Sequence, residues 1–227
     1  MIDYPVIVKK VKQSIALIFV LDTHGDIVGT GSGFVFMKKG SLVTCNHVVA
    51  EAHNVLVNFF GSTQSLQGKV IVQDVEHDLA LIKFNDDSRE PLLMGKMGRV
   101  IEGMSILFSH CELGSEYLTT RPGILSSITK DANGITTYLI DGTVNSGNSG
   151  CPLMDASGGV IGVVRARRVV REDILERLRG MKTGPLSSHE IDLIKINRVL
   201  MGNLQLGVGY AIPASYIPRP GHAVLYY

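Results

Sequence analysis

The sequence predicts an all-β fold made of many short strands joined by tight turns. Hydrophobic residues make up 45% of the 227 residues and charged residues 19%, so we expect a folded core rather than disorder along the whole chain. The chain has 25 glycines and no tryptophan, and short runs rich in Val, Ile and Phe alternate with turn residues. Asn133 and Gly134 stand between two alternating apolar runs, which is the strongest short-range signal for a β-hairpin.

The expected strands fall into two sets, and the polar segment 85–91 is the predicted linker between them. Each strand is a short apolar run bounded by turn residues. The first set covers residues 14–21, 33–37, 42–44, 55–59, 68–74 and 79–84. The second set covers residues 104–108, 117–130, 135–140, 160–164 and 207–212.

Composition also bears on the compartment and the partners. Lys9, Lys10 and Lys12 precede the apolar run 14–21, but no small-residue cleavage site follows, so we interpret the run as a buried strand and not as a secretion signal. No segment is apolar over the roughly 18 residues that a membrane span needs. Three cysteines form no disulfide framework and predict a reducing compartment, hence a cytoplasmic protein. A formal net charge of +1 disfavours a protein devoted to nucleic acid or anionic membranes.

Residues 165–206 depart from the β pattern and predict a two-helix insertion. Apolar residues recur at helical spacing on both sides of the turn GMKTGP. Ser187 and Glu190 match a capping box, which predicts that the second helix begins after Ser187. The apolar positions are Ile174, Leu175 and Leu178 before the turn, and Ile191, Ile194 and Leu200 after it.

The first part of this insertion is strongly basic. Between Arg165 and Lys182, seven basic residues stand against three acidic ones, a net charge of +4 in a chain whose remainder carries −3. Two interpretations stay open. The charges either form a solvated helix face with ion pairs four residues apart, or they recruit an acidic substrate or a regulatory partner, with nucleic acid the less favoured partner.

Three separated motifs supply the parts needed for nucleophilic acyl transfer. His47 lies in TCNHVV, Asp78 lies in HDLALIKF, and Ser149 lies in the Gly-rich bend of DGTVNSGNSGCPL. A serine is a good nucleophile only when an imidazole accepts its proton, and a buried carboxylate holds that imidazole in the useful tautomer. Asp74 is a rival carboxylate, but only Asp78 directly precedes the apolar run LALI.

The order of these residues along the chain separates the folds that use such a triad. His47, Asp78 and Ser149 follow the order of the chymotrypsin-type double barrel, and the α/β-hydrolase pattern G-x-S-x-G fails at Cys151. Together TCNHVV, DLALIKF, DGTVNSGNSGCPL, GGVIGVV and GVGYAIP resemble the protease domain of the HtrA family of trypsin-like serine proteases. The resemblance covers residues from about 6 to 217, apart from the insertion.

This resemblance implies two six-stranded antiparallel β-barrels of chymotrypsin type. The N-terminal barrel is expected in residues 1–90 and the C-terminal barrel in residues 91–227, with the helical insertion at about 165–206. HtrA proteins usually continue into a PDZ domain, for which this sequence has no room after the protease.

The resemblance also implies a chemistry. His47 is then the general base, Asp78 its orienting carboxylate and Ser149 the nucleophile, while the N–H groups of Gly147 and Ser149 form the oxyanion hole. We therefore expect a serine endopeptidase that cleaves protein or peptide substrates through an acyl-enzyme, under the control of a partner. A catalytically silent protease-fold binding module and an esterase stay open as alternatives.

By the same resemblance, Thr143 stands near the base of the primary specificity pocket, where trypsins carry an aspartate. We therefore expect a small or medium apolar P1 residue rather than Lys or Arg. The substrate backbone is expected to pair as an extra antiparallel strand with the segment from Val163 to Arg165. The resemblance assigns the pocket wall to Val208, Gly209 and Tyr210, and the contact with the substrate backbone to Val163, Val164 and Arg165. Asn145 is a further expected substrate-binding residue.

No metal and no cofactor are expected. The spacings HExxH, CxxC and the EF-hand do not occur. The run GTGSGF is interpreted as a glycine-rich turn into a strand, because Phe34 replaces the last glycine of the dinucleotide motif. Cys45 and Cys151 each lie two residues from a triad member. We interpret them as small buried side chains, with a redox-sensitive pair as the alternative.

Overall fold

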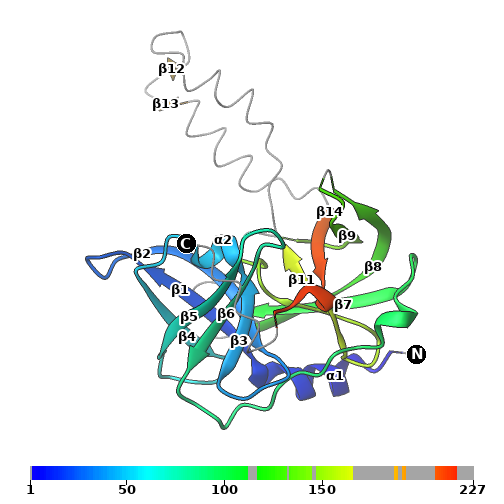
Figure 1. Ribbon diagram of the computed structural model, residues 1–227, viewed down its shortest axis with the longest axis horizontal. Helices are drawn as coiled ribbons and strands as arrows, with labels where there is room; N and C mark the ends of the chain where they lie inside the picture. The colour runs from blue at the N-terminus through cyan, green and yellow to red at the C-terminus, as the bar shows by residue number, and fades with distance from the viewer. Residues whose placement is uncertain are drawn as a thin grey trace. The chain divides into compact units, whose positions relative to one another are not determined.

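Two closed β-barrels form the described part of the chain (Figure 1). The barrels have six antiparallel strands each, so the fold class predicted from the sequence is confirmed. In Figure 1 the strands of the first barrel run from blue to teal, and those of the second run from green to red. The computed structural model describes residues 2–111, 117–131, 133–144, 147–165, 187–188, 191–192 and 208–218.

The strands of the first barrel are β1 (Ile15–Leu21), β2 (Ile27–Val35), β3 (Ser41–Cys45), β4 (Asn54–Phe59), β5 (Leu66–Asp74) and β6 (Leu79–Phe84). They pair in the order β1-β2-β3-β6-β5-β4, and β1 closes the barrel by pairing with both β2 and β4. The run behind the N-terminal lysines is thus strand β1, buried along most of its length.

The strands of the second barrel are β7 (Ser105–Cys111), β8 (Leu118–Lys130), β9 (Thr136–Asp141), β10 (Pro152–Met154), β11 (Val160–Arg165) and β14 (Val208–Pro213). They pair in the order β10-β11-β14-β9-β8-β7. Strand β10 is not among the expected strands, because three residues directly after a Gly-rich bend carry no periodic signal.

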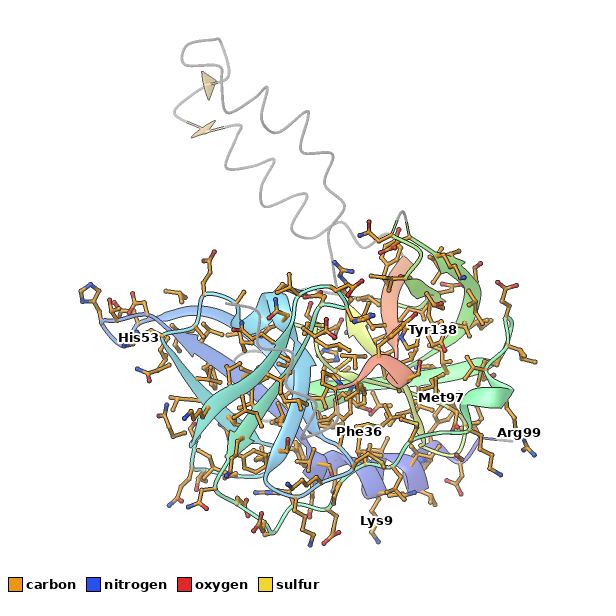
Figure 2. The ribbon with its side chains drawn as sticks, viewed as in Figure 1. Lys9, Phe36, His53, Met97, Arg99 and Tyr138 are labelled. Carbon is orange, nitrogen blue, oxygen red and sulfur yellow. The ribbon has the colours of Figure 1, made fainter. Side chains whose placement is uncertain are left out.

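Each barrel has its own apolar interior, and a third cluster of buried side chains joins the two. Phe34 and Phe36 lie in this third cluster with their ring centroids 5.8 Å apart in an edge-on arrangement, and Figure 2 shows Phe36 near the centre of the molecule. Because the cluster draws on both barrels, it holds together the elements that carry the candidate site. Its members include Leu17, Phe34, Phe36, Val43 and Leu79 from the first half, and Leu107, Met154, Val160, Val163 and Ile212 from the second.

A short helix at the N-terminus, α1 (Tyr4–Val11), is absent from the sequence prediction. The Asp3 side chain caps it by accepting a hydrogen bond from the Val6 N–H at 3.2 Å, and Pro5 lies in its first turn. Ile7 and Val11, one turn apart, are buried in the cluster between the barrels. The Asp and Pro at its start were the available signal for this helix.

The connection between the barrels is longer than the predicted linker 85–91. It covers residues 85–104 and contains the single 3₁₀ turn η2 (Met97–Arg99). Isolated bridges join Leu92 to Phe36 and Met94 to Val160, so the connection contacts both barrels.

The predicted two-helix insertion lies almost wholly outside the described residues. Where residues 187–192 are described, the prediction is wrong: β12 (Ser187–Ser188) pairs with β13 (Ile191–Asp192), so no helix begins after Ser187. A serine side chain bonds to nearby backbone groups in turns as well as at helix caps, so the capping-box pattern alone does not require a helix. By compactness the chain divides into one unit of Met1–Ala166 with Gly207–Tyr227, and a second unit of Arg167–Leu206.

Within the described ranges, no helix has both the length and the apolar character that a membrane crossing requires.

Candidate active site

The histidine and the aspartate of the predicted triad lie at the same edge of two paired strands. His47 follows the end of β3, and Asp78 precedes the start of β6. Strand β3 is buried throughout and leads into the short helix α2 (Asn46–Val49), which carries His47 in its first turn. Asp78 occupies the turn before β6, which pairs with β3, and it adopts a left-handed φ of 55°. Such a backbone is uncommon outside glycine but tolerated by Asp. The Asn46 N–H donates to the Asp78 carbonyl at 3.0 Å, which ties the two segments together.

The three predicted catalytic side chains form one continuous line of contacts. Asp78 Oδ2 lies 2.8 Å from His47 Nδ1, and His47 Nε2 lies 3.1 Å from Ser149 Oγ. The second carboxylate oxygen, Oδ1, accepts the backbone N–H of His47 at 2.8 Å. Asp78 and Ser149 are each 6% exposed, whereas the His47 side chain is 44% exposed. The imidazole thus lies between a buried carboxylate and a serine hydroxyl and is still accessible from solvent.

A glycine with a positive φ shapes the bend around Ser149. Gly150 has a φ of 88°, and a Cβ at this position would lie 2.1 Å from the Ser32 carbonyl oxygen, so any side chain would clash with backbone. Its N–H donates to the Val164 carbonyl at 2.8 Å. The close approach of β2 to the bend therefore requires glycine here.

Ser32 on β2 holds this bend against the first barrel, a role that the sequence analysis missed. Its Oγ donates to the Gly147 carbonyl at 2.7 Å, and its backbone N–H donates to the Ser149 carbonyl at 2.8 Å. Thr44 Oγ1 in turn donates to the Ser32 carbonyl at 2.7 Å. The available signal was the run GTGSGF, which is a stretch of β2 rather than a turn. A small polar residue between glycines in a buried strand indicates a close approach of another backbone.

The rival carboxylate, Asp74, belongs to a second histidine–aspartate pair, which it forms with His77. Asp74 accepts the His77 N–H at 2.9 Å on Oδ1, and its Oδ2 lies 2.8 Å from His77 Nδ1. The His77 ring stacks on Tyr216 with centroids 4.3 Å apart. This pair braces the turn that precedes Asp78 against η3 (Ala214–Tyr216), which follows the last strand of the second barrel. We therefore assign it a structural role.

Arg165 contacts the triad instead of facing outward for a substrate side chain. Its Nε lies 2.9 Å from Asp78 Oδ2, the same oxygen that His47 contacts. The Arg165 side chain is 23% exposed. The resemblance to the family implied a place for Arg165 beside the substrate backbone. In the structure its charge is paired with a carboxylate of the protein itself.

Val163 lies in the cluster between the barrels, and Val164 lies in the interior of the second barrel. Both are fully buried. Strand β11 pairs on one side with β10 and on the other with β14. The Val164 N–H donates to the Cys151 carbonyl at 2.9 Å, and its carbonyl accepts from Gly150. The backbone of Val163 and Val164 is already paired on both sides, so a substrate cannot add a strand at these two residues. The prediction that they bind the substrate backbone is wrong.

The other residues assigned to the specificity pocket lie around the end of β14. The backbones of Val208 and Gly209 pair with Asp141 and Ile140 of β9, and Thr143 follows β9 by two residues. Gly209 faces Val144, since a Cβ on Gly209 would lie 2.3 Å from a Val144 methyl carbon. Val144 therefore packs against Gly209, one of the residues assigned to the pocket wall, although its own sequence position carried no signal. Tyr210 is partly buried in β14, and Asn145 lies outside the described residues.

The three cysteines are free and buried. Burial, reinforced by the charge of Asp78, raises the pKa of Cys45 well above its ordinary value, and its Sγ donates to the Val164 carbonyl at 3.3 Å. Burial likewise raises the pKa of Cys151, and that of Cys111 to about 11. These thiols are therefore neutral and poorly nucleophilic at neutral pH.

Cys45, His47 and Asp78 place one ligand atom each within 4.8 Å of the others, as a metal site would. Two contacts disfavour a metal ion there. The Cys45 Sγ is directed at the Val164 carbonyl, to which it donates. The Arg165 guanidinium already supplies positive charge at Asp78. We assign the cluster to the triad.

The buried thiols lead to a testable prediction. In the native chain, iodoacetamide should modify Cys45 and Cys151 at least ~100-fold more slowly than in the urea-unfolded chain, because alkylation requires an accessible thiolate. The measurement is mass spectrometry of tryptic peptides over a time course at mildly alkaline pH. Rapid modification of the native chain would show instead that these thiols are accessible and reactive, as the redox-sensitive alternative requires.

Two six-stranded barrels with an imidazole between a buried carboxylate and a serine hydroxyl define the class of chymotrypsin-fold serine proteases. The family described as the trypsin-like peptidase domain matches residues 31–163. The chain belongs to this family.

The curated relatives that the chain matches are HtrA-type proteases, in agreement with the resemblance drawn from the motifs. Protease Do-like 5, chloroplastic, of Arabidopsis thaliana is 34% identical over 160 residues, which are 63% of this chain and 49% of that protein. A probable periplasmic serine endoprotease, DegP-like, of Hahella chejuensis is 34% identical over 137 residues, 59% of this chain and 29% of that protein. The chain thus spans about half or less of the length of these relatives.

Solved structures show the same fold. The HtrA-type protease AlgW with a tripeptide superimposes with a TM-score of 0.70 at 22% identity, over 94% of this chain and 60% of that one. The Rv3671c protease in an inactive form superimposes with a TM-score of 0.66 at 20% identity, over 94% of this chain and 89% of that one.

Proposed function

We propose that this chain is a serine endopeptidase that cleaves peptide bonds through an acyl-enzyme. The observation that carries the proposal is the line from Asp78 Oδ2 through His47 Nδ1 and Nε2 to Ser149 Oγ, with steps of 2.8 and 3.1 Å. Both distances suit proton transfer between the groups that a serine hydrolase needs. Membership of the trypsin-like peptidase family supports the same chemistry.

In the proposed reaction, Ser149 Oγ attacks the substrate carbonyl carbon while its proton passes to His47 Nε2. Asp78 holds the imidazole with Nδ1–H toward Oδ2 and stabilises the imidazolium that forms. The Gly147 and Ser149 N–H groups stabilise the oxyanion. His47 then returns the proton to the amine that leaves, and water hydrolyses the acyl-enzyme by the same two transfers in reverse.

A fluorophosphonate probe tests this proposal, since it phosphonylates only an activated serine. The expected result is stoichiometric labelling of Ser149 in the intact chain, found by peptide mass spectrometry, and none in Ser149→Ala. A folded chain that stays unlabelled would support the silent binding module and contradict the proposal. Casein and a peptide library then separate a peptidase from an esterase, which would cleave small esters but no peptide.

We expect the P1 side chain to be small or medium and apolar. Thr143 carries no charge where trypsins carry an acid, and Val144 packs against Gly209 at the pocket wall. Profiling on a peptide library should rank Ala, Val and Leu above Lys and Arg. A dominant preference for Arg would show that an acidic side chain reaches the pocket, and would overturn the assignment of Thr143.

Partner control through the basic insertion is a further part of the proposal. Arg165 is paired with Asp78, which leaves six basic residues from Arg167 to Lys182. Reversing the charges of Arg167, Arg168 and Arg171 to Glu should weaken cleavage of an acidic protein substrate, most strongly at low salt. Cleavage of a small neutral peptide should be unchanged. Equal activity on both substrates at every salt concentration would assign these charges to a solvated surface.

A cytoplasmic location stays a prediction from the cysteine content. The relatives named above are a chloroplastic and a probable periplasmic protein.

A further inference from the structure

Asp78 Oδ2 is shared by two side chains. His47 Nδ1 lies 2.8 Å from it and Arg165 Nε lies 2.9 Å from it. Oδ1 is occupied by the His47 backbone N–H. The carboxylate of the triad therefore has a fixed positive charge beside it in addition to the imidazole that it orients.

The contact between Arg165 and Asp78 is mainly electrostatic. Nε lies at ion-pair distance from Oδ2, but its N–H is not aligned for a hydrogen bond, and among the described residues no other acceptor takes it. The Asp78 side chain is only 8% exposed, so solvent screens the pair weakly. A buried carboxylate is stabilised in its ionised form by an adjacent cation.

The sheet fixes Arg165 in this place. It is the last residue of β11, where it pairs with Tyr210 of β14, and the residue before it is fully buried. The neutral Cys45 thiol from β3 and the Ser149 hydroxyl also face the histidine–aspartate pair. Among the described residues, Arg165 is the permanent cation in ion-pair contact with Asp78.

We propose that Arg165 is a positioning residue of the triad, whose guanidinium holds the Asp78 carboxylate in place and opposes a second positive charge on the same oxygen. A guanidinium and an imidazolium on the same carboxylate oxygen repel each other, so we expect that removal of the guanidinium favours the protonated imidazole. This inference rests on the proposed function, since it concerns the base of that reaction.

The pH profile of kcat/KM tests the inference. In Arg165→Met, the acid limb should move upward by about one pH unit, because the like charge is gone. Arg165→Lys keeps the charge and should restore most of the wild-type limb. Arg99→Met is the matched control, since Arg99 is an exposed arginine at the edge of the molecule (Figure 2) and should leave the limb in place.

Two results would overturn the inference. One is an acid limb that stays in place in Arg165→Met. The other is an equal loss of kcat/KM at every pH, which would give Arg165 a structural role alone. If Arg165→Met folds poorly, Arg165→Gln takes its place, because Gln keeps a polar group near the carboxylate.

A measurement that requires no catalysis separates this inference from the proposed function. NMR of intact chains with labelled histidine follows the pH at which the His47 imidazole gains its proton. That pH should rise by about one unit in Arg165→Met and stay constant in Arg99→Met. A chain that never reacts with fluorophosphonate would refute the proposed function, and the NMR shift would still decide on Arg165.

Discussion

Ser149→Ala should lower kcat on a peptide substrate by about 10⁶, because the substitution removes the attacking oxygen. The hydroxyl contributes the 3.1 Å contact to His47 Nε2, and losing it creates no clash in the bend. Circular dichroism and Tm should therefore match the wild type within a few degrees. The measurement is steady-state cleavage of a fluorogenic apolar peptide.

Ser126→Ala is the matched control for this substitution. Ser126 is an exposed serine on β8, so its removal should leave kcat unchanged. A Ser149→Ala chain that cleaves at a rate near that of the control would refute the nucleophile assignment.

Asp78→Asn should lower kcat by about 10⁴, because the amide favours the wrong imidazole tautomer. The variant should also lose stability, since it leaves the partly buried Arg165 cation beside an uncharged amide. Adding Arg165→Met to Asp78→Asn should recover part of the lost Tm without recovering kcat. A double-mutant cycle in Tm measures this coupling.

Asp74→Asn is the matched control, because Asp74 makes the same two contacts to His77 that Asp78 makes to His47. Its kcat should stay within about tenfold of the wild type, because the Ser149 hydroxyl contacts the imidazole of the other pair, His47. If Asp74→Asn caused the larger loss, the carboxylate of the triad would be Asp74.

The sequence was enough to predict the parts of the site and the class of fold. Strand positions followed from period-2 apolar runs and turn residues, which are local properties of the chain. The order of His47, Asp78 and Ser149 singled out the double barrel, because each fold that uses this triad has its own order. The helix α1 was not predicted because it is too short for its apolar periodicity to stand out in an apolar chain. Strand β10 was not predicted because its residues carry no periodic pattern.

Only the tertiary structure decided which groups meet at the site. Arg165 is more than 80 residues from Asp78 along the chain and reaches it because β11 runs up to the first barrel, so no local pattern could reveal the ion pair. The same holds for Ser32 of the first barrel, which donates hydrogen bonds to the bend around Ser149 in the second half of the chain. Val163 and Val164 look like any β residues in sequence, and their burial depends on having β10 and β14 on both sides. Sequence patterns report local backbone preference and residue type, whereas charge pairing and edge pairing are set by contacts between distant segments.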